Sequence, residues 1–97
     1  MDYVELNNLF CDAEEAYSDK QYRRALELFS YVLEKSIASI DSDPEMPSLA
    51  IDAYDYIGVL HSLADDYIWE ECSELINRYR HRIETLEQKP KDGASAF

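Results

Sequence analysis

The stretch AEEAYSDKQYRRALELFSYVL, residues 13–33, carries the pattern that decides the fold. Ala13 and Ala25 are small enough to let two helices approach closely. The large side chains that fill the space around them are Tyr17, Tyr22 and Phe29. Residues 18–20, Ser-Asp-Lys, lie between the two alanines, where short polar side chains compete with helical hydrogen bonding. The stretch therefore predicts the end of one helix, a tight turn and the start of an antiparallel second helix.

Apolar residues continue on both sides of this stretch at spacings of three and four, the period of an amphipathic helix. The first stripe consists of Tyr3, Leu6, Leu9, Phe10, Ala13, Ala16 and Tyr17, and the second of Tyr22, Ala25, Leu26, Phe29, Val32, Leu33, Ile37 and Ile40. Asp2 and Glu5 have the spacing of a capping box at the start of the first helix. We expect a first hairpin over about residues 2–40, with its second helix over about residues 20–40.

A linker with two prolines follows, over residues 41–47. Pro44 and Pro47 each suit a first helical turn, and Asp43 is the expected N-cap before Pro44. A third helix is predicted over about residues 48–65 and a fourth over about residues 67–88. Their stripes are Leu49, Ala50, Ala53, Tyr54, Ile57, Gly58, Leu60, His61 and Ala64, then Ile68, Cys72, Leu75, Ile76, Tyr79, Ile83 and Leu86.

These stripes predict an all-α fold of two antiparallel helical hairpins, because the 97 residues include only two glycines and three prolines to interrupt helices. The helical domain is expected over residues 1–88, with a second hairpin at about residues 48–88. The sequence KPKDGASAF, residues 89–97, is small and polar, and we expect it to be a flexible, disordered tail.

The chain is strongly acidic, with 21 Asp and Glu against nine Lys and Arg and a formal charge of −12. Such a surface repels phosphate backbones, which argues against nucleic-acid binding. The acidity serves either solubility alone or a function, namely binding a basic partner or mimicking nucleic acid. No apolar run approaches a membrane span, and the acidic N-terminus is not a signal peptide. We expect a cytoplasmic or nuclear protein, with Cys11 and Cys72 as buried small residues in a reducing compartment or, alternatively, joined in a disulfide.

The two predicted hairpins can be laid over each other, with Tyr22-x-x-Ala25 over Trp69-x-x-Cys72 and a second turn that is two residues longer. The pattern resembles a tetratricopeptide repeat (TPR) hairpin, in which a small residue, a break, an aromatic residue, a second small residue and a further aromatic residue follow one another in this order. The first hairpin is most similar to those of the TPR subunits of the anaphase-promoting complex. The resemblance implies two stacked repeats in which Gly58 is the point of closest helix approach. A four-helix bundle without repeats is the alternative that the same stripes allow.

TPR proteins bind segments of other proteins in a groove lined by the first helix of each repeat. By position, the resemblance implies a partner-binding groove of Asn7, Phe10, Cys11, Glu14 and Tyr17 with Asp52, Asp55, Tyr56, Val59 and Ser62. The carboxylates would attract Lys or Arg and the aromatic residues would anchor apolar side chains. The plainer alternative is that Phe10 and Tyr17 belong to the core and the carboxylates to a solvated face. An acidic groove argues against a heat-shock co-chaperone, whose ligand is a carboxylate.

We therefore expect a protein-interaction module, either a TPR-like adaptor or the N-terminal piece of a scaffold, which binds a basic or apolar segment of a partner protein. A homodimer is one of the assemblies that we expect. The alternative is an acidic inhibitor, an immunity-type protein or a secretion-type chaperone that masks a basic protein. An enzyme is not expected, because zinc-ligand spacings, glycine-rich phosphate loops and catalytic triads are absent. Packing accounts for His61, and the favourable helix-end dipole accounts for His81. No cofactor or metal is expected.

Overall fold

A computed structural model of the protein describes residues 2–63 and 66–88. These residues form four helices, α1 (Tyr3–Ser18), α2 (Tyr22–Ala38), α3 (Met46–Leu63) and α4 (Asp66–Gln88), and no strand occurs among them. The all-α prediction with four helices is confirmed. The predicted tail at residues 89–97 and the predicted last residues of the third helix lie outside the described residues.

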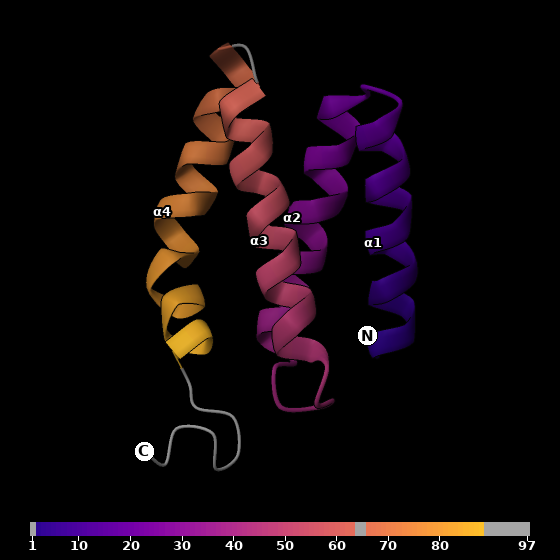
Figure 1. Ribbon diagram of the computed structural model, residues 1–97, viewed down its shortest axis with the longest axis vertical. Helices are drawn as coiled ribbons and strands as arrows, with labels where there is room; N and C mark the ends of the chain where they lie inside the picture. Colours follow the sequence, from indigo (N-terminus) through magenta and orange to yellow (C-terminus); the bar gives the residue numbers. More distant parts are fainter. Residues whose placement is uncertain (1, 64–65, 89–97) are drawn as a thin grey trace.

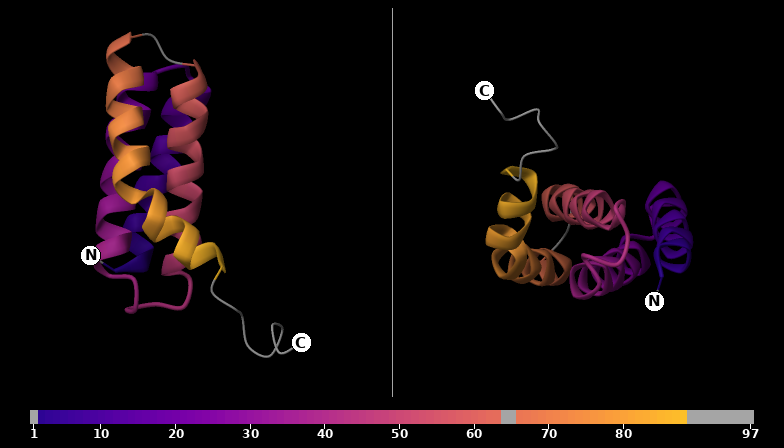
Figure 2. Two further views of the ribbon diagram at one scale, coloured as in Figure 1. Left: turned by 90° about the vertical axis from the view of Figure 1, so that its left-hand side faces the viewer. Right: turned by 90° about the horizontal axis from the view of Figure 1, so that it is seen from below.

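The helices form an open row in chain order, each antiparallel to the one before (Figure 1). α1 packs along α2, α2 along α3 and α3 along α4, whereas α1 touches α3 only slightly and α2 touches α4 only slightly. The described parts of α1 and α4 do not touch, and Figure 2 shows them at opposite ends of the molecule. A closed four-helix bundle would bring these two helices together. Here α1 and α3 share one face, with α2 behind them (Figure 1).

Both ends of α1 are fixed by local hydrogen bonds. At its start the carboxylate of Asp2 accepts the Glu5 N–H at 2.9 Å and the Glu5 carboxylate accepts the Asp2 N–H at 3.3 Å, which is the predicted capping box. At its end the Lys20 N–H donates to the Tyr17 carbonyl and the Gln21 N–H to the Ala16 carbonyl. These bonds and the left-handed φ of 63° at Lys20 make a Schellman turn. The turn therefore lies one residue later than predicted.

α3 begins at Met46, two residues before the predicted start near Ser48. Asp43 causes the early start, because its carboxylate accepts the Glu45 N–H at 2.8 Å and its carbonyl accepts the Met46 N–H at 3.0 Å. Pro47 consequently lies inside the first helical turn, a position where a missing N–H costs nothing. The connection between the hairpins consequently lies at residues 39–45, two residues earlier than the predicted linker and of the same length.

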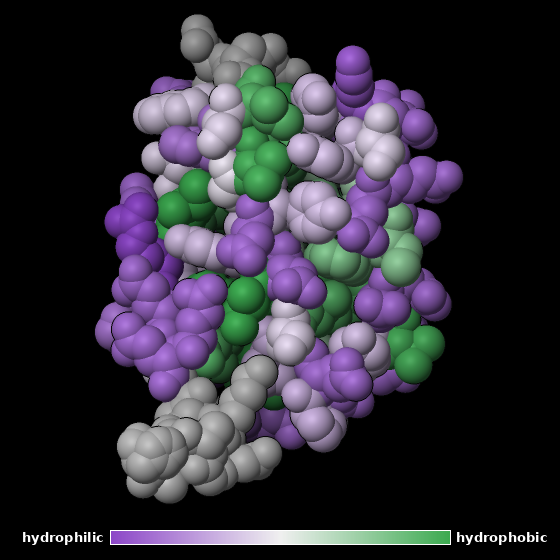
Figure 3. Space-filling view, in the orientation of Figure 1, coloured by the Kyte–Doolittle hydropathy of each residue, from purple (hydrophilic) through white to green (hydrophobic). Residues whose placement is uncertain are grey.

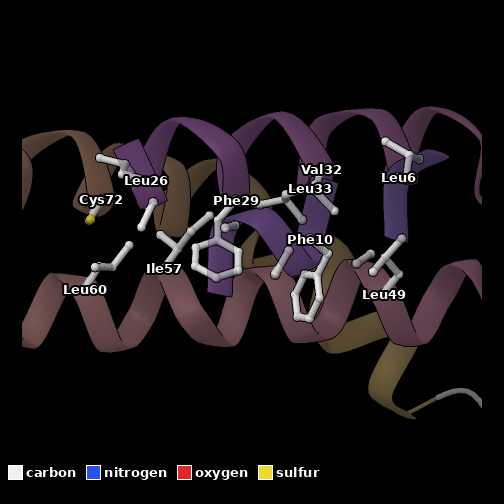
Figure 4. Packing of buried hydrophobic residues seen from close by; sticks show 14 of the residues in the cluster. Leu6, Phe10, Leu26, Phe29, Val32, Leu33, Leu49, Ile57, Leu60 and Cys72 are labelled. Carbon is white, nitrogen blue, oxygen red and sulfur yellow. The ribbon is translucent and has the colours of Figure 1, made fainter. Parts of the chain in front are cut away.

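The core runs continuously along the row of helices (Figure 4). Phe29 of α2 lies near its middle, fully buried, with the ring of Phe10 edge-on at a centroid distance of 5.5 Å. Small residues are buried where neighbouring helices approach each other: Ala13, Ala16, Ala25, Ala50 and Ala53. They let the larger side chains of adjacent helices interdigitate, as residues 13–33 predicted for Ala13 and Ala25.

Two predictions about single residues are wrong. A Cβ built on Gly58 would meet nothing within 4 Å, so no helix approaches closely there. Cys11 is exposed on α1, whereas Cys72 is buried as predicted, and both are free thiols rather than a disulfide. Trp69, overlaid on half-buried Tyr22, is 47% exposed, and its ring stacks on His61 at 4.8 Å.

Candidate partner-binding groove

A hollow of about 270 Å³ lies between α1 and α3 on the face that they share, and we call it the α1–α3 groove. It is lined by Phe10, Glu14, Asp52, Asp55, Tyr56 and Val59. All six are among the residues predicted to line a groove, although the two contributing helices are separated in the sequence by the whole of α2. The helix periodicity that places them on one face was visible in the sequence.

The remaining predicted residues lie outside the lining of this hollow. Tyr17 is nearest, because its ring meets the ring of Tyr56 at a centroid distance of 5.4 Å. Asn7 is half-buried on α1, and Cys11 is exposed on the same helix. Ser62 is exposed, and its hydroxyl donates to the Gly58 carbonyl of its own helix at 3.3 Å. The structure therefore brings Tyr17 to the edge of the groove but not the other three.

The base of the groove is a cluster of aromatic rings. Tyr56 stacks almost parallel on Phe29, with centroids 4.4 Å apart and planes 10° apart. Phe10 meets the ring of Tyr56 edge-on, with the centroids 5.7 Å apart. Phe10 is 8% exposed and belongs to the core, whereas Tyr17 and Tyr56 are half-buried. The core interpretation thus holds for Phe10, and the tyrosines present a fixed aromatic surface to the groove.

Tyr56 also joins the two helices of the groove through its hydroxyl. The phenol donates a hydrogen bond of 2.9 Å to Oε2 of Glu14. Partial burial and this bond together raise the pKa of Tyr56 to about 12. The hydroxyl therefore remains a donor at neutral pH.

The carboxylates of the groove repel one another. Partial burial raises the pKa of Asp52, and the neighbouring charges of Asp55 and Glu14 raise it further. The pKa of Asp55 is raised by partial burial and then by Glu87 of α4. Each of these pKa values rises because the charged form is disfavoured where it lies. A cation placed between these groups would relieve that cost.

The cations of the described residues are confined to two of the four helices and one turn, whereas carboxylates occur on all four helices. α1 and α3 contain no Lys or Arg but six carboxylates: Glu5, Asp12, Glu14, Glu15, Asp52 and Asp55. The cations of the described residues belong to α2, α4 and the turn before α2: Lys20, Arg23, Arg24, Lys35, Arg78, Arg80 and Arg82. This segregation was available from the sequence, because it appears once each charge is assigned to its predicted helix.

The groove face becomes apolar toward the C-terminal end of α3. Val59 is 42% exposed and Leu63, one helical turn later, is 51% exposed. Figure 3 shows hydrophobic surface over this end of α3, beside the more polar centre of the same face. Leu63 was not among the predicted groove residues, although its spacing from Val59 places both on one helical face.

A larger hollow of about 510 Å³ lies elsewhere, where α2 begins. It is lined by Lys20, Gln21, Tyr22, Arg23, Arg24, Glu27 and Ile68. Arg23 pairs there with Glu27 at 3.5 Å and also with Glu71 of α4. The hollow therefore lies beside the place where the start of α2 contacts α4.

Within residues 2–63 and 66–88, no three or more His, Cys, Asp and Glu side chains are grouped so that they could hold a metal ion. None of the helices in these ranges has the length and apolar character needed to cross a membrane. No protein family, no curated protein sequence and no solved structure matches the chain.

Proposed function

We propose that the protein is an interaction module that holds a basic and apolar segment of a partner protein in the α1–α3 groove. The observation that carries this proposal is the composition of the groove. Carboxylates surround an aromatic base, and neither contributing helix has a Lys or Arg to neutralise them. Complementary charge of this kind governs the rate and specificity of association.

The open row of helices supports the proposal that the chain is TPR-like. In a stack of helical hairpins each unit contacts only its neighbours, and the first helices of successive hairpins line one surface. Here α1 and α3 line a common groove, and the described parts of α1 and α4 make no contact. On this proposal the molecule is a two-repeat adaptor or a part of a scaffold.

The groove favours a partner segment with two kinds of side chain. A Lys or Arg can extend its alkyl stem over Tyr56 and place its charge between Asp52 and Asp55. An apolar residue of the same segment can then cover Val59 and Leu63, which are exposed without it. The tyrosine ring is held by stacking and by its hydrogen bond, so little side-chain order remains to be lost on binding.

An array of defined synthetic peptides tests the proposal. We expect the peptides bound by the protein to be enriched in sequences that combine Lys or Arg with aromatic or aliphatic residues. The double substitution Asp52→Asn with Asp55→Asn should weaken this binding about tenfold, whereas Asp12→Asn, an exposed α1 residue that does not line the groove, should not. A bound set without cation enrichment, or one unaffected by the double substitution, would refute the proposal.

A second candidate is an acidic inhibitor or chaperone that masks a folded basic protein, and the net charge of −12 favours it. This function would use acidic residues across the surface rather than those of one groove. Its binding would weaken strongly with salt and hardly respond to the groove substitutions. Titration of the wild type and the double variant with a basic protein, at low salt and at 1 M salt, separates the two functions.

A further inference from the structure

A second hollow lies between α2 and α4, on the side of the molecule away from the α1–α3 groove. Seen along the helices, α2 and α3 lie on opposite sides of the row, between the two outer helices (Figure 2). The volume of the hollow is about 250 Å³. We call the surface around it the α2–α4 face, and its lining residues are Glu27, Ser30, Tyr31, Glu34, Leu75 and Tyr79.

The α2–α4 face has an apolar centre. Tyr31 of α2 is 40% exposed, and Leu75 and Tyr79 of α4 are half-buried. The ammonium group of Lys35 lies 5.5 Å from the centroid of the Tyr31 ring, within the range of a cation–π contact. Aromatic surface bordered by charged side chains is typical of the centre and rim of a protein–protein interface.

The charges on the two helices of this face follow each other in opposite order. Arg23 at the start of α2 pairs with Glu71 near the start of α4, because the two helices are parallel and begin side by side. Glu34 lies eleven residues after Arg23, and Arg82 lies eleven residues after Glu71. Eleven residues make three helical turns, so Glu34 and Arg82 lie at the same height, on the same sides of their helices as the first pair.

Glu34 and Arg82 nevertheless do not meet within one chain. α4 diverges from α2 toward its C-terminal end, as the left view of Figure 2 shows. Both side chains are exposed, and neither forms an ion pair with any other described residue. The charge complementarity of the two helices is therefore used at their start and left open further along.

The α2–α4 face is also the side on which two copies of this acidic chain repel each other least. α1 and α3 have six carboxylates and no Lys or Arg. α2 and α4 have six cations against eight carboxylates. Because each chain has a formal charge of −12, self-repulsion opposes any contact through α1 and α3 much more than one through α2 and α4.

We propose that two copies of the chain form a symmetric dimer through their α2–α4 faces. With a two-fold axis along the helices, α2 of each copy lies opposite α4 of the other copy and runs in the same direction. Glu34 of one copy then meets Arg82 of the other, and the symmetry forms this contact twice. Tyr31 of each copy covers Leu75 and Tyr79 of the other copy.

The size of the face predicts a weak, reversible dimer. A surface two helices wide, about 20 Å, and as long as the 17-residue α2, about 25 Å, covers on the order of 500 Å². Standard interfaces bury about 800 Å² per partner, and smaller ones are typical of transient contacts. Both α1–α3 grooves remain uncovered in this dimer, so one dimer offers two grooves. The binding of two partner segments rests on the proposed function, whereas the dimer itself does not.

Charge exchange tests the dimer in sedimentation velocity experiments on the full chain, from about 10 μM to 1 mM protein at physiological ionic strength. The wild type should show a monomer–dimer equilibrium. Glu34→Arg and Arg82→Glu, each alone, should weaken dimerisation about tenfold or more, because each puts like charges at both contacts. An equimolar mixture of the two variants should dimerise about as well as the wild type, since every contact in the mixed dimer again joins opposite charges.

Matched controls separate this contact from general effects of charge and folding. Asp12→Arg on α1 changes the net charge as Glu34→Arg does, and Arg80→Glu changes it as Arg82→Glu does, on another side of α4. Neither control should alter dimerisation by more than about twofold. A single chain with both Glu34→Arg and Arg82→Glu should dimerise like the wild type, which excludes misfolding as the cause of the single-variant effects.

Three results would overturn the inference: a wild type that stays monomeric over the whole range, a dimer that the single substitutions leave unchanged, and a mixture that associates no better than its components. Peptide binding to the α1–α3 groove distinguishes this failure from that of the proposed function. A strictly monomeric chain that binds basic and apolar peptides contradicts the dimer alone. A charge-dependent dimer that binds no such peptide establishes the dimer and contradicts the proposed function.

Discussion

The hydroxyl of Tyr56 on α3 lies 2.9 Å from the carboxylate of Glu14 on α1, two residues 42 positions apart in the sequence. The helices that carry them otherwise touch only slightly, because α2 lies between and behind them. The hydrogen bond therefore sets the width of the α1–α3 groove at its centre. It also fixes the tyrosine ring above Phe29, where the two rings stack.

Replacing Tyr56 by Phe should lower the free energy of unfolding by about 1 kcal/mol, the net contribution of a typical hydrogen bond within a protein. The ring and its stacking on Phe29 remain, so the loss isolates the hydroxyl. Urea denaturation of the two proteins measures it. Tyr54→Phe is the matched control, because the Tyr54 hydroxyl has no hydrogen-bond partner among the described residues and its removal should change little.

The same substitution should alter the pH dependence of stability. The pKa of Tyr56 is raised to about 12 in the folded protein, above the usual value near 10. The contribution of the Tyr56 hydroxyl to the free energy of unfolding is fully present below pH 10 and is lost as the pH rises toward 12, because Tyr56 loses its proton at a lower pH in the unfolded chain than in the folded protein. The stability difference between wild type and Tyr56→Phe should therefore shrink over this interval. A constant difference in thermal unfolding from pH 9 to 12 would contradict the raised pKa.

Asp52→Asn should stabilise the folded protein at pH 7. The pKa of Asp52 is raised by partial burial and by the charges of Asp55 and Glu14, so its ionised form is disfavoured in the folded state. A raised carboxyl pKa contributes stability at low pH that is lost as the pH increases through the folded value. We expect a higher melting temperature for the variant at pH 7 and a smaller difference at pH 3. A lower melting temperature at pH 7 would show that Asp52 instead has a stabilising partner.

Gly58→Ala should stabilise the protein by about 0.5–1 kcal/mol, the usual gain when a helical glycine becomes alanine. A Cβ at this position meets nothing within 4 Å, so no steric cost offsets the gain. The reciprocal change, Ala53→Gly on the same helix, should destabilise by at least as much, because Ala53 is fully buried. Chemical denaturation of both variants checks the two predictions. A Gly58→Ala protein less stable than the wild type would contradict the first and indicate the close helix approach that the TPR resemblance implies.

Thiol reagents should distinguish the two cysteines. Cys11 is exposed, whereas burial raises the pKa of Cys72 to about 11 and shields its sulfur. One thiol per chain should react rapidly with a maleimide at pH 7, and the second only after unfolding. Mass spectrometry after brief labelling identifies the modified residue, and Cys11→Ser should abolish the fast reaction.

The sequence predicted the structure well where apolar residues recur with the period of a helix. The apolar stripes located all four helices, and six of the residues that the TPR resemblance assigned to a groove by position line the α1–α3 groove. Predictions made from residue type alone were weaker. Cys11 was expected to be buried because cysteine usually is, yet it directly follows the buried Phe10 and so faces another direction. The start of α3 depended on backbone bonds to Asp43, which no apolar pattern reports.

The open row of helices also determines how the chain can fold. Nearly all tertiary contacts join helices that are consecutive in the sequence, since the described parts of α1 and α4 do not meet. Only short loops must close before such contacts form, and the entropy lost in closing them is small. We therefore expect folding on the microsecond-to-millisecond timescale typical of helical proteins with local contacts.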